Sequence, residues 1–302
     1  MTEAFTLAHF SDVHLPPVLG APWSYWNAKR VLGSANWLRK RKRVHRAAVA
    51  DTLVADAKAL RPDHIAITGD LINLGLPMEY QSALTWLKSV GAPADVTVVP
   101  GNHDIYSSLH GEPGVARWAE YMGGENETLA FPFVRRLGPV ALVGLNSAVE
   151  TPPFYASGKL GRHQLEIAGE LLRDLGEEGL IRVVLIHHPP LPHLASARRG
   201  LTDAAHLVHL LERGTAELVL YGHNHRTRVD WLPAREGAIP IVGIGSASAG
   251  VVHGDEPAAS YNLFTFFKSG NGVRIRHIVR GIEGEDSCVR KISETILEAP
   301  KR

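Results

Sequence analysis

The chain has 302 residues, of which 45% are hydrophobic and 21% are charged, and its formal net charge is +1. This profile is typical of a soluble globular protein and argues against a disordered chain or a general nucleic-acid binder. No apolar run approaches the roughly 20 residues of a transmembrane helix, and the first ten residues lack the pattern of a secretory signal. Cys288 is the single cysteine, so no intrachain disulfide is expected and a cytoplasmic protein is predicted.

Strand and helix patterns alternate over the first three quarters of the chain. The predicted strands are 6–11, 64–68, 96–99, 140–145, 182–186 and 217–221. The predicted helices are 46–60, 77–90, 162–175 and 204–212, with Pro62 after the first and Pro77 opening the second. Such alternation favours a layered α/β domain.

The pattern changes after residue 225. Residues 239–244, 261–267 and 273–279 read as strands with no helix between them, which predicts a second, antiparallel-rich sheet. With no linker or repeat in view, we expect one domain over 1–280, followed by a polar C-terminal tail over 281–302.

Polar segments follow five of the predicted strands. They are Asp12-Val13-His14, Gly69-Asp70, Gly101-Asn102-His103-Asp104, His187-His188 and Gly222-His223-Asn224-His225. Open α/β sheets place their sites at the carboxyl ends of strands, so these segments are expected to converge. Mixed carboxylate, amide and imidazole donors suit transition metals, and a pair of metal ions suits the hydrolysis of phosphate esters.

The ordered set Asp-x-His, Gly-Asp, Gly-Asn-His, a lone His and Gly-His-x-His resembles the calcineurin-like metallophosphoesterase superfamily. The resemblance covers about residues 6–226. It implies a four-layer αββα sandwich of two mixed sheets with helices outside and a dinuclear metal site at the strand carboxyl ends. Asp104 after His103, and Pro189-Pro190 after the His pair, make the chain most similar to bacterial class III cyclic nucleotide phosphodiesterases.

The resemblance also implies the metal ligands. One metal is expected on Asp12, His14 and His225, a second on Asn102, His187 and His223, with Asp70 bridging the two. Both ions are expected to be Mn, Fe, Zn or Co. His187 is favoured over His188 because the family ligand immediately follows the apolar strand.

The remaining motif residues are assigned to substrate and catalysis by the same resemblance. His103 is similar to the family histidine that contacts the scissile phosphate and protonates the leaving oxygen, and Asp104 is expected to orient it. Asn102, His103, His188 and Arg226 are candidate substrate contacts, although a solvated Arg226 is an equal alternative.

The implied reaction is hydrolysis of a small phosphodiester by a metal-bridging hydroxide, with a 3′,5′- or 2′,3′-cyclic nucleotide as the leading substrate. Three alternatives stay open: a UDP-diacylglucosamine-type pyrophosphatase at the membrane surface, a phosphomonoesterase, and a non-catalytic scaffold. The chain lacks the Val-Asp-Arg stretch of protein serine/threonine phosphatases after its Gly69-Asp70. An oligomer is compatible with the sequence, and no specific nucleic-acid partner is implied.

A basic and aromatic insertion is predicted at about 16–45. No acidic residue occurs between Leu15 and Ala50. Eight cations and four aromatics lie there: Lys29, Arg30, Arg39, Lys40, Arg41, Lys42, Arg43, Arg46, Trp23, Tyr25, Trp26 and Trp37. Three interpretations are open: the segment caps the substrate, it contacts an anionic membrane through residues 23–46, or Trp26, Val31 and Leu38 pack a helical hairpin onto the domain with the cations solvated.

Overall fold

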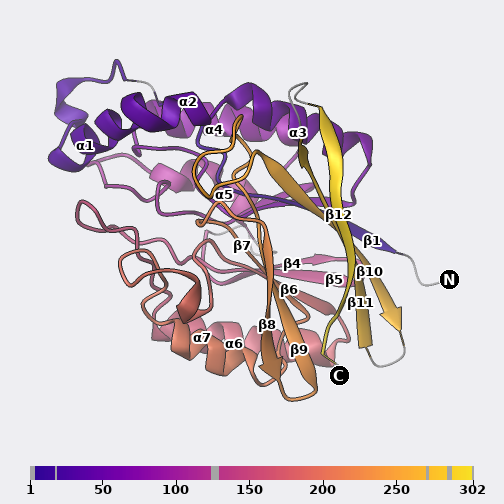
Figure 1. Cartoon of the computed structure of the whole chain (residues 1–302). Helices are drawn as coiled ribbons and strands as arrows, with labels where there is room; N and C mark the ends of the chain where they lie inside the picture. Colours follow the sequence, from indigo (N-terminus) through magenta and orange to yellow (C-terminus); the bar gives the residue numbers. More distant parts are fainter. Residues whose placement is uncertain (1–3, 18, 124–128, 270–271, 284–287, 301–302) are drawn as a thin grey trace.

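Two six-stranded sheets form the centre of the computed structural model, which describes residues 4–300 apart from 18, 124–128, 270–271 and 284–287 (Figure 1). The first sheet has the order β12-β11-β10-β1-β2-β3. Its strands are β1 (Phe5–Phe10), β2 (His64–Ile67), β3 (Val96–Val98), β10 (Ser260–Ser269), β11 (Gly272–Ile282) and β12 (Val289–Glu298). β1, β2 and β3 are parallel, while β10, β11 and β12 add antiparallel neighbours, so the sheet is mixed.

The second sheet has the order β4-β5-β6-β7-β9-β8 and is also mixed. Its strands are β4 (Phe133–Leu137), β5 (Val140–Gly144), β6 (Ile181–Leu185), β7 (Leu218–Tyr221), β8 (Arg228–Ala234) and β9 (Gly237–Gly243). The four inner strands are parallel, and β4 and β8 pair antiparallel at the two edges.

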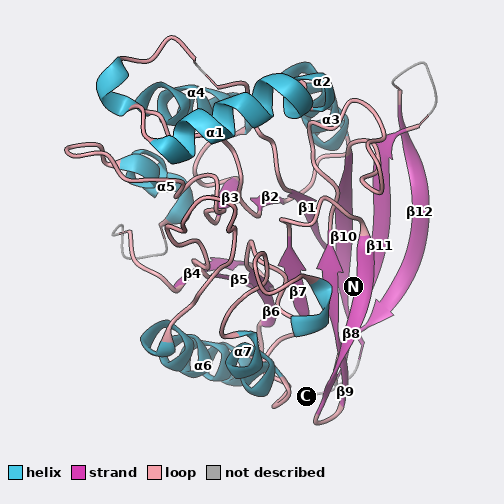
Figure 2. Ribbon diagram, turned by 60° about the vertical axis from the view of Figure 1, so that its left-hand side comes forward, coloured by secondary structure: helices cyan, strands magenta, loops and turns pink. Residues whose placement is uncertain are grey.

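Helices cover the outer face of each sheet, which gives four layers (Figures 1 and 2). On one side lie α1 (Ala28–Asn36), α2 (Lys42–Val44), α3 (Ala47–Ala59), α4 (Pro77–Val90) and α5 (Ala119–Met122), and on the other lie α6 (Arg162–Glu177) and α7 (Ala204–Leu211). Short helical turns are η1 (Trp23–Tyr25), η2 (Trp37–Arg41), η3 (Gly114–Trp118) and η4 (Pro192–Leu194). The predicted αββα sandwich is confirmed.

Strand β6 shows why the inner strands read as unbroken apolar runs. Val183 and Leu185 belong to the core between the sheets, whereas Val184 and Ile186 belong to the core under α6 and α7. Successive side chains of a strand point to opposite faces, and both faces are buried here. The paired cores therefore hold the carboxyl ends of the strands in fixed positions.

The prediction for the strands after residue 225 was wrong in its grouping. These strands form no sheet of their own, because β8 and β9 join the second sheet while β10 and β11 extend the first. The predicted tail over 281–302 is also wrong where the structure describes it, since β12 pairs with β11 over nine register positions. Residues 284–287 and 301–302 of that range lie outside the described residues. Alternation shows that a segment is a strand, but not which strand it joins.

The basic and aromatic insertion folds as a helical arm made of η1, α1, η2 and α2 (Figure 1). Arg30, only 1% exposed, anchors the arm by donating to the carbonyl oxygens of Leu74, Gly75 and Ser107. The expected packing residues differ, because Trp37 is buried while Val31 and Leu38 are 51% and 52% exposed. Within the described residues, no helix is long and apolar enough to cross a membrane. Residue 18 of the insertion is outside the description.

Candidate metal centre

The five polar segments meet at one edge of the two sheets, each just past the end of a parallel strand. Two glycines allow the loops to approach closely. A Cβ on Gly101 would lie 2.2 Å from Asp70 Oδ1, and one on Gly222 would lie 1.9 Å from Ser11 Oγ. Any side chain at these two positions would push the donor loops apart, which explains the glycines in both motifs.

The backbone is strained at most of the predicted ligands. Positive φ angles occur at Asp12 (54°), His14 (45°), Asp70 (55°), His223 (67°) and His225 (51°). Non-glycine residues avoid this region, and each such conformation costs about 1–3 kcal/mol. Five of the seven predicted ligands share this conformation, and such strain often clusters at functional sites.

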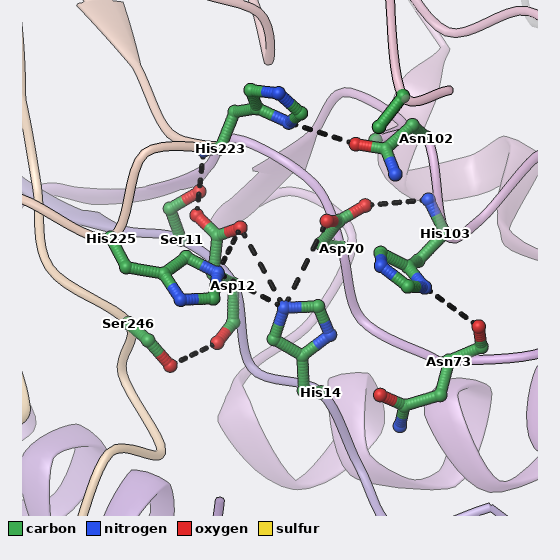
Figure 3. Close-up of polar contacts among 12 residues, drawn as sticks. Ser11, Asp12, His14, Asp70, Asn73, Asn102, His103, His223, His225 and Ser246 are labelled. Atoms are coloured by element: carbon green, nitrogen blue, oxygen red, sulfur yellow. Dashed lines mark hydrogen bonds and ion pairs between the residues drawn. The ribbon is translucent and has the colours of Figure 1, made fainter. Parts of the chain in front are cut away.

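The first group of donors consists of Asp12, His14 and His225 (Figure 3). His225 Nε2 lies 3.1 Å from Asp12 Oδ1 and 3.2 Å from His14 Nε2. His14 Nε2 lies 3.8 Å from Asp12 Oδ1. Two imidazole nitrogens and a carboxylate thus face one another in a buried space, an arrangement that fits a cation among them.

The second group consists of Asn102, His187 and His223. Asn102 Oδ1 lies 3.2 Å from His187 Nε2 and 2.9 Å from His223 Nδ1, and the two imidazole nitrogens are 3.3 Å apart. His223 therefore faces the group through Nδ1, and its Nε2 is buried without a hydrogen-bond partner. These donors also fit a metal ion.

Asp70 lies between the two groups. Its Oδ2 is 3.8 Å from His14 Nε2 and 3.4 Å from His187 Nε2, while its Oδ1 accepts a 2.7 Å hydrogen bond from the His103 backbone N–H (Figure 3). One carboxylate thus faces both groups, which is the position that a bridging ligand needs.

The other ring nitrogen of three of these histidines is held by the protein. His14 Nδ1 lies 3.3 Å from the Ile72 carbonyl oxygen, and His187 Nδ1 lies 2.6 Å from that of Thr68. His225 Nδ1 lies 2.9 Å from Glu256 Oε2. Such partners fix the tautomer and direct each Nε2 lone pair toward the centre, as is usual for metal-binding histidines.

Strong charge coupling accompanies this geometry. Burial alone would raise the pKa of Asp70, but His187 and His103 hold it well below its usual range. In turn, although burial disfavours the charged imidazole, Asp70 raises the pKa of His187 to about 9. Asp12 raises the pKa of His225 to about 9 in the same way. The pKa values of Asp12 and Asp70 are both lowered, so these two carboxylates stay ionised and attract positive charge.

His188 is not part of the centre. Its Nδ1 lies 2.8 Å from Ser147 Oγ and its Nε2 lies 3.2 Å from the Ala156 carbonyl oxygen, so both ring nitrogens are engaged. The prediction that His188 contacts the substrate is therefore wrong. Its ring packs against the rings of His187 and His223. The choice of His187 as the donor agrees with this geometry.

Asp104 does not orient His103, contrary to the prediction. Its carboxylate accepts backbone N–H groups instead, including those of Asp70 at 2.8 Å and Gly101 at 2.8 Å, and so fixes two donor loops. The group that orients His103 is the Asn73 carbonyl oxygen, which accepts from His103 Nδ1 at 2.7 Å (Figure 3). Asp104 is thus a positioning residue.

Arg41 is a site residue that the sequence did not single out. Its Nη1 donates to His103 Nε2 at 2.9 Å, so His103 carries its proton on Nδ1. Burial and then the Arg41 charge lower the pKa of His103 to about 4. In the sequence, only the cluster of cations in the insertion hinted at such a residue. Arg41 and His103 are 62 residues apart along the chain, and the fold of the arm brings them into contact.

A cavity of about 500 Å³ lies beside the first group of donors. Arg226 lines it together with Arg199, Arg228 and Glu256, and Arg226 Nη2 donates to Asp255 Oδ2 at 2.7 Å. Asn224 points away from the donors, toward the Leu194 carbonyl oxygen. Arg226 thus has room to meet a distal substrate group, and its predicted role stays a prediction.

A family model described as calcineurin-like phosphoesterase matches residues 5–227, which include all five donor segments. The chain belongs to the calcineurin-like phosphoesterase family. The family and fold inferred from the motifs are confirmed.

Among curated relatives, this calcineurin-like phosphoesterase is similar to a glycerophosphodiester phosphodiesterase, GpdQ, of Enterobacter lignolyticus. The two are 28% identical over 179 residues, 55% of this chain and 56% of the relative. It is also 28% identical over 171 residues to a cAMP/cGMP dual specificity phosphodiesterase, MT0825, of Mycobacterium tuberculosis, covering 55% and 49% of the two chains. The chain spans about half the length of the curated relatives it matches.

Solved structures show the same fold. A dimetal phosphatase from Danio rerio superposes with a TM-score of 0.62 at 13% identity, covering 98% of this chain and 99% of that one. The purple acid phosphatase PPD1 from yellow lupin superposes with a TM-score of 0.62 at 13% identity, covering 99% and 54%. At this identity the likeness concerns the fold alone.

Proposed function

We propose that this calcineurin-like phosphoesterase is a dinuclear metal-dependent phosphodiesterase. The observation that carries the proposal is the convergence of seven donor side chains in two groups that share Asp70, with His103 beside them. In the first group Asp12, His14 and His225 would hold one ion, and in the second Asn102, His187 and His223 would hold the other. Family membership and the phosphodiesterase names of the relatives support the same reaction class.

A bound metal pair would supply positive charge for the phosphate and lower the pKa of a bound water. The chain's own residues do the rest. The carboxylates of Asp104 and Glu79 accept hydrogen bonds from backbone N–H groups of the loop after β2, and these bonds hold Asp70 in place. A metal ligand that is held in place before the reaction lowers the reorganisation that the reaction would otherwise need.

We assign Arg41 and His103 to the leaving side of the phosphate. A phosphate anion between them would replace His103 Nε2 as the acceptor of the hydrogen bond from the Arg41 guanidinium. The same negative charge would favour the protonated imidazole, because a nearby anion stabilises the charged form. His103 Nε2–H could then donate its proton to the departing alkoxide oxygen, while the Asn73 carbonyl keeps the ring oriented.

A nucleotide is the favoured substrate class, with 3′,5′- or 2′,3′-cyclic nucleotides first. Two observations support this choice: the cyclic nucleotide activity named for MT0825, and the cavity lined by arginines beside the donors. A phosphomonoester is the less favoured substrate. The same donor set would serve monoesters and diesters alike, so the residues that line the pocket would select between them.

The test is an assay of manganese-loaded protein on bis(p-nitrophenyl) phosphate, p-nitrophenyl phosphate, the two cyclic nucleotides and a nucleotide-linked lipid. We expect faster turnover of diesters than of the monoester, with loss of activity in excess chelator. His103→Ala should keep both metals and lose most turnover. Protein that binds two metal ions and hydrolyses no diester would contradict the proposal.

A second candidate, a pyrophosphatase acting on nucleotide-linked lipids at a membrane surface, is favoured by the exposed face of the helical arm. Trp23 is 90% exposed, and Val31, Leu32 and Leu38 are 51%, 45% and 52% exposed. The exposed cations of the arm are Arg39, Lys40, Lys42 and Arg43. Apolar side chains beside cations, with no acidic residue from 16 to 49, complement an anionic lipid surface.

Vesicle sedimentation tests this candidate. Wild-type protein should sediment with vesicles of phosphatidylcholine and phosphatidylglycerol and stay in solution with phosphatidylcholine alone. The double variant Leu32→Glu/Leu38→Glu should lose sedimentation, while Leu60→Glu, at a leucine 44% exposed at the end of α3, should keep it. Equal sedimentation of the wild type and the double variant would contradict membrane contact through the arm.

A further inference from the structure

A third imidazole, His45, faces the first group of donors. His45 is 4% exposed, and its ring centroid lies 4.7 Å from that of His14 and 5.6 Å from that of His225. One ring nitrogen from each of the three histidines lies within 4.8 Å of the others. His45 belongs to none of the five motifs, because it comes from the end of the helical arm.

Two serine side chains engage Nδ1 of His45. Ser246 Oγ donates to the Asp12 carbonyl oxygen at 2.6 Å (Figure 3), so it accepts from its other neighbours. Those neighbours are the Ser248 backbone N–H, Ser248 Oγ and His45 Nδ1, each at 3.3 Å, and His45 Nδ1 also lies 2.9 Å from Ser248 Oγ. Because Nδ1 of His45 faces these two serines, Nε2 is the ring nitrogen left for a ligand.

The position of His45 is fixed by its backbone. His45 forms a bridge with Ala249, the Arg46 N–H donates to the Ser248 carbonyl oxygen at 2.9 Å, and the Gly250 N–H donates to that of Val44 at 2.8 Å. The ring lines a cavity of about 120 Å³ together with His225 and Glu256. An imidazole nitrogen held in a fixed place beside two candidate metal-binding imidazoles meets the requirement for a metal ligand.

We propose that His45 Nε2 is a further ligand of the metal ion held by Asp12, His14 and His225. This inference rests on the proposed dinuclear centre and adds to it a donor from outside the five motifs. It also ties the end of the helical arm, next to Arg41, to the metal.

Proton NMR of the cobalt-loaded protein tests the proposal without an activity assay. Each ligating imidazole keeps one N–H, which gives an exchangeable signal shifted by the paramagnetic ion. His14, His187, His223 and His225 account for four such signals, and we expect five. His45→Ala should remove one signal and weaken binding of one of the two ions by about tenfold or more in calorimetry.

His253→Ala is the matched control, because His253 is an exposed histidine that lines the same small cavity. It should keep five signals and both affinities. Four signals in the wild type, or unchanged affinities in folded His45→Ala, would overturn the role of His45 while leaving the dinuclear centre intact. Wild-type protein that binds fewer than two ions would instead contradict the proposed function itself.

Discussion

Strands β6 and β7 carry buried charged or ionisable groups at both ends, and the two ends differ in how these groups are matched. At the amino ends, Arg182 and Glu217 are 6% and 1% exposed and pair directly, with Nη2 2.7 Å from Oε1 and Nε 3.1 Å from Oε2. At the carboxyl ends, His187 and His223 face each other through nitrogens 3.3 Å apart.

The polar groups at the amino ends serve the structure, whereas those at the carboxyl ends are candidates for function. Arg182 also donates to the carbonyl oxygens of Leu172 and Gly214, so its guanidinium is satisfied within the protein. The donors at the other end are oriented by their neighbours but point at one another, and the backbone there is strained. A buried pair that neutralises itself holds strands together, whereas converging lone pairs are complete only with a cation.

The largest expected effect is at the carboxyl end. His187→Ala removes a donor of the second group, and we expect it to lower kcat/KM on an aryl phosphodiester by about 1,000-fold. It should bind one metal ion fewer than the wild type. Steady-state kinetics and metal analysis measure these two outcomes. Near wild-type turnover would show that His187 is not a ligand.

At the amino end the effect should fall on stability instead. Glu217→Ala leaves Arg182 buried without its carboxylate, and we expect a loss of about 3–5 kcal/mol in the free energy of unfolding. Metal content of the folded protein should be unchanged. Urea unfolding measures the loss, and Arg182→Met/Glu217→Leu should recover much of it. A loss confined to activity would contradict the division between the two ends.

A smaller effect on the free energy of unfolding is expected at acidic pH. His64, at the amino end of β2, is 1% exposed, and burial followed by the Arg135 charge lowers its pKa to about 3. The unfolded chain binds this proton near pH 6.5, so the stability contributed by neutral His64 is full above 6.5 and falls as pH drops toward 3. The slope should be about 1.4 kcal/mol per pH unit for this residue.

Urea unfolding in chelator across that pH window checks the slope. His64→Gln should show a shallower loss of stability than the wild type, because glutamine does not titrate. Identical slopes in the two proteins would mean that His64 takes up its proton without unfolding the chain.

The smallest effect is expected where charges are exposed. Arg162 and Glu166 pair at 2.9 Å at the start of α6, with side chains 92% and 59% exposed. Solvent screens such a pair, so Glu166→Ala should change the free energy of unfolding by less than about 0.5 kcal/mol. A change as large as that of Glu217→Ala would show that burial is not what distinguishes these pairs.

Local signals in the sequence predicted much of this structure. Helix α4 begins at Pro77 and ends at Val90 as expected, because proline suits the first turn and Gly91 follows the last. The seven predicted ligands converge because each follows a buried parallel strand. Their metal-binding role remains a prediction for the measurements above.

The features that the sequence did not predict depend on contacts between residues that are distant along the chain. Strand β12 is exposed along most of its length and carries no clear alternating pattern, so only its pairing with β11 identifies it. Asp104 and His103 are neighbours in sequence, but Asp104 turns toward backbone N–H groups that fold in from the loop after β2. Arg41 and His45 reach the site through the path of the helical arm, which no local pattern encodes.

We propose that the two donor groups hold two metal ions. Anomalous diffraction from crystals of manganese-loaded protein, recorded at the manganese absorption edge, would locate these ions. We predict two peaks, one among Asp12, His14 and His225 and one among Asn102, His187 and His223, with Asp70 contacting both. A single peak, or peaks away from these side chains, would contradict the account.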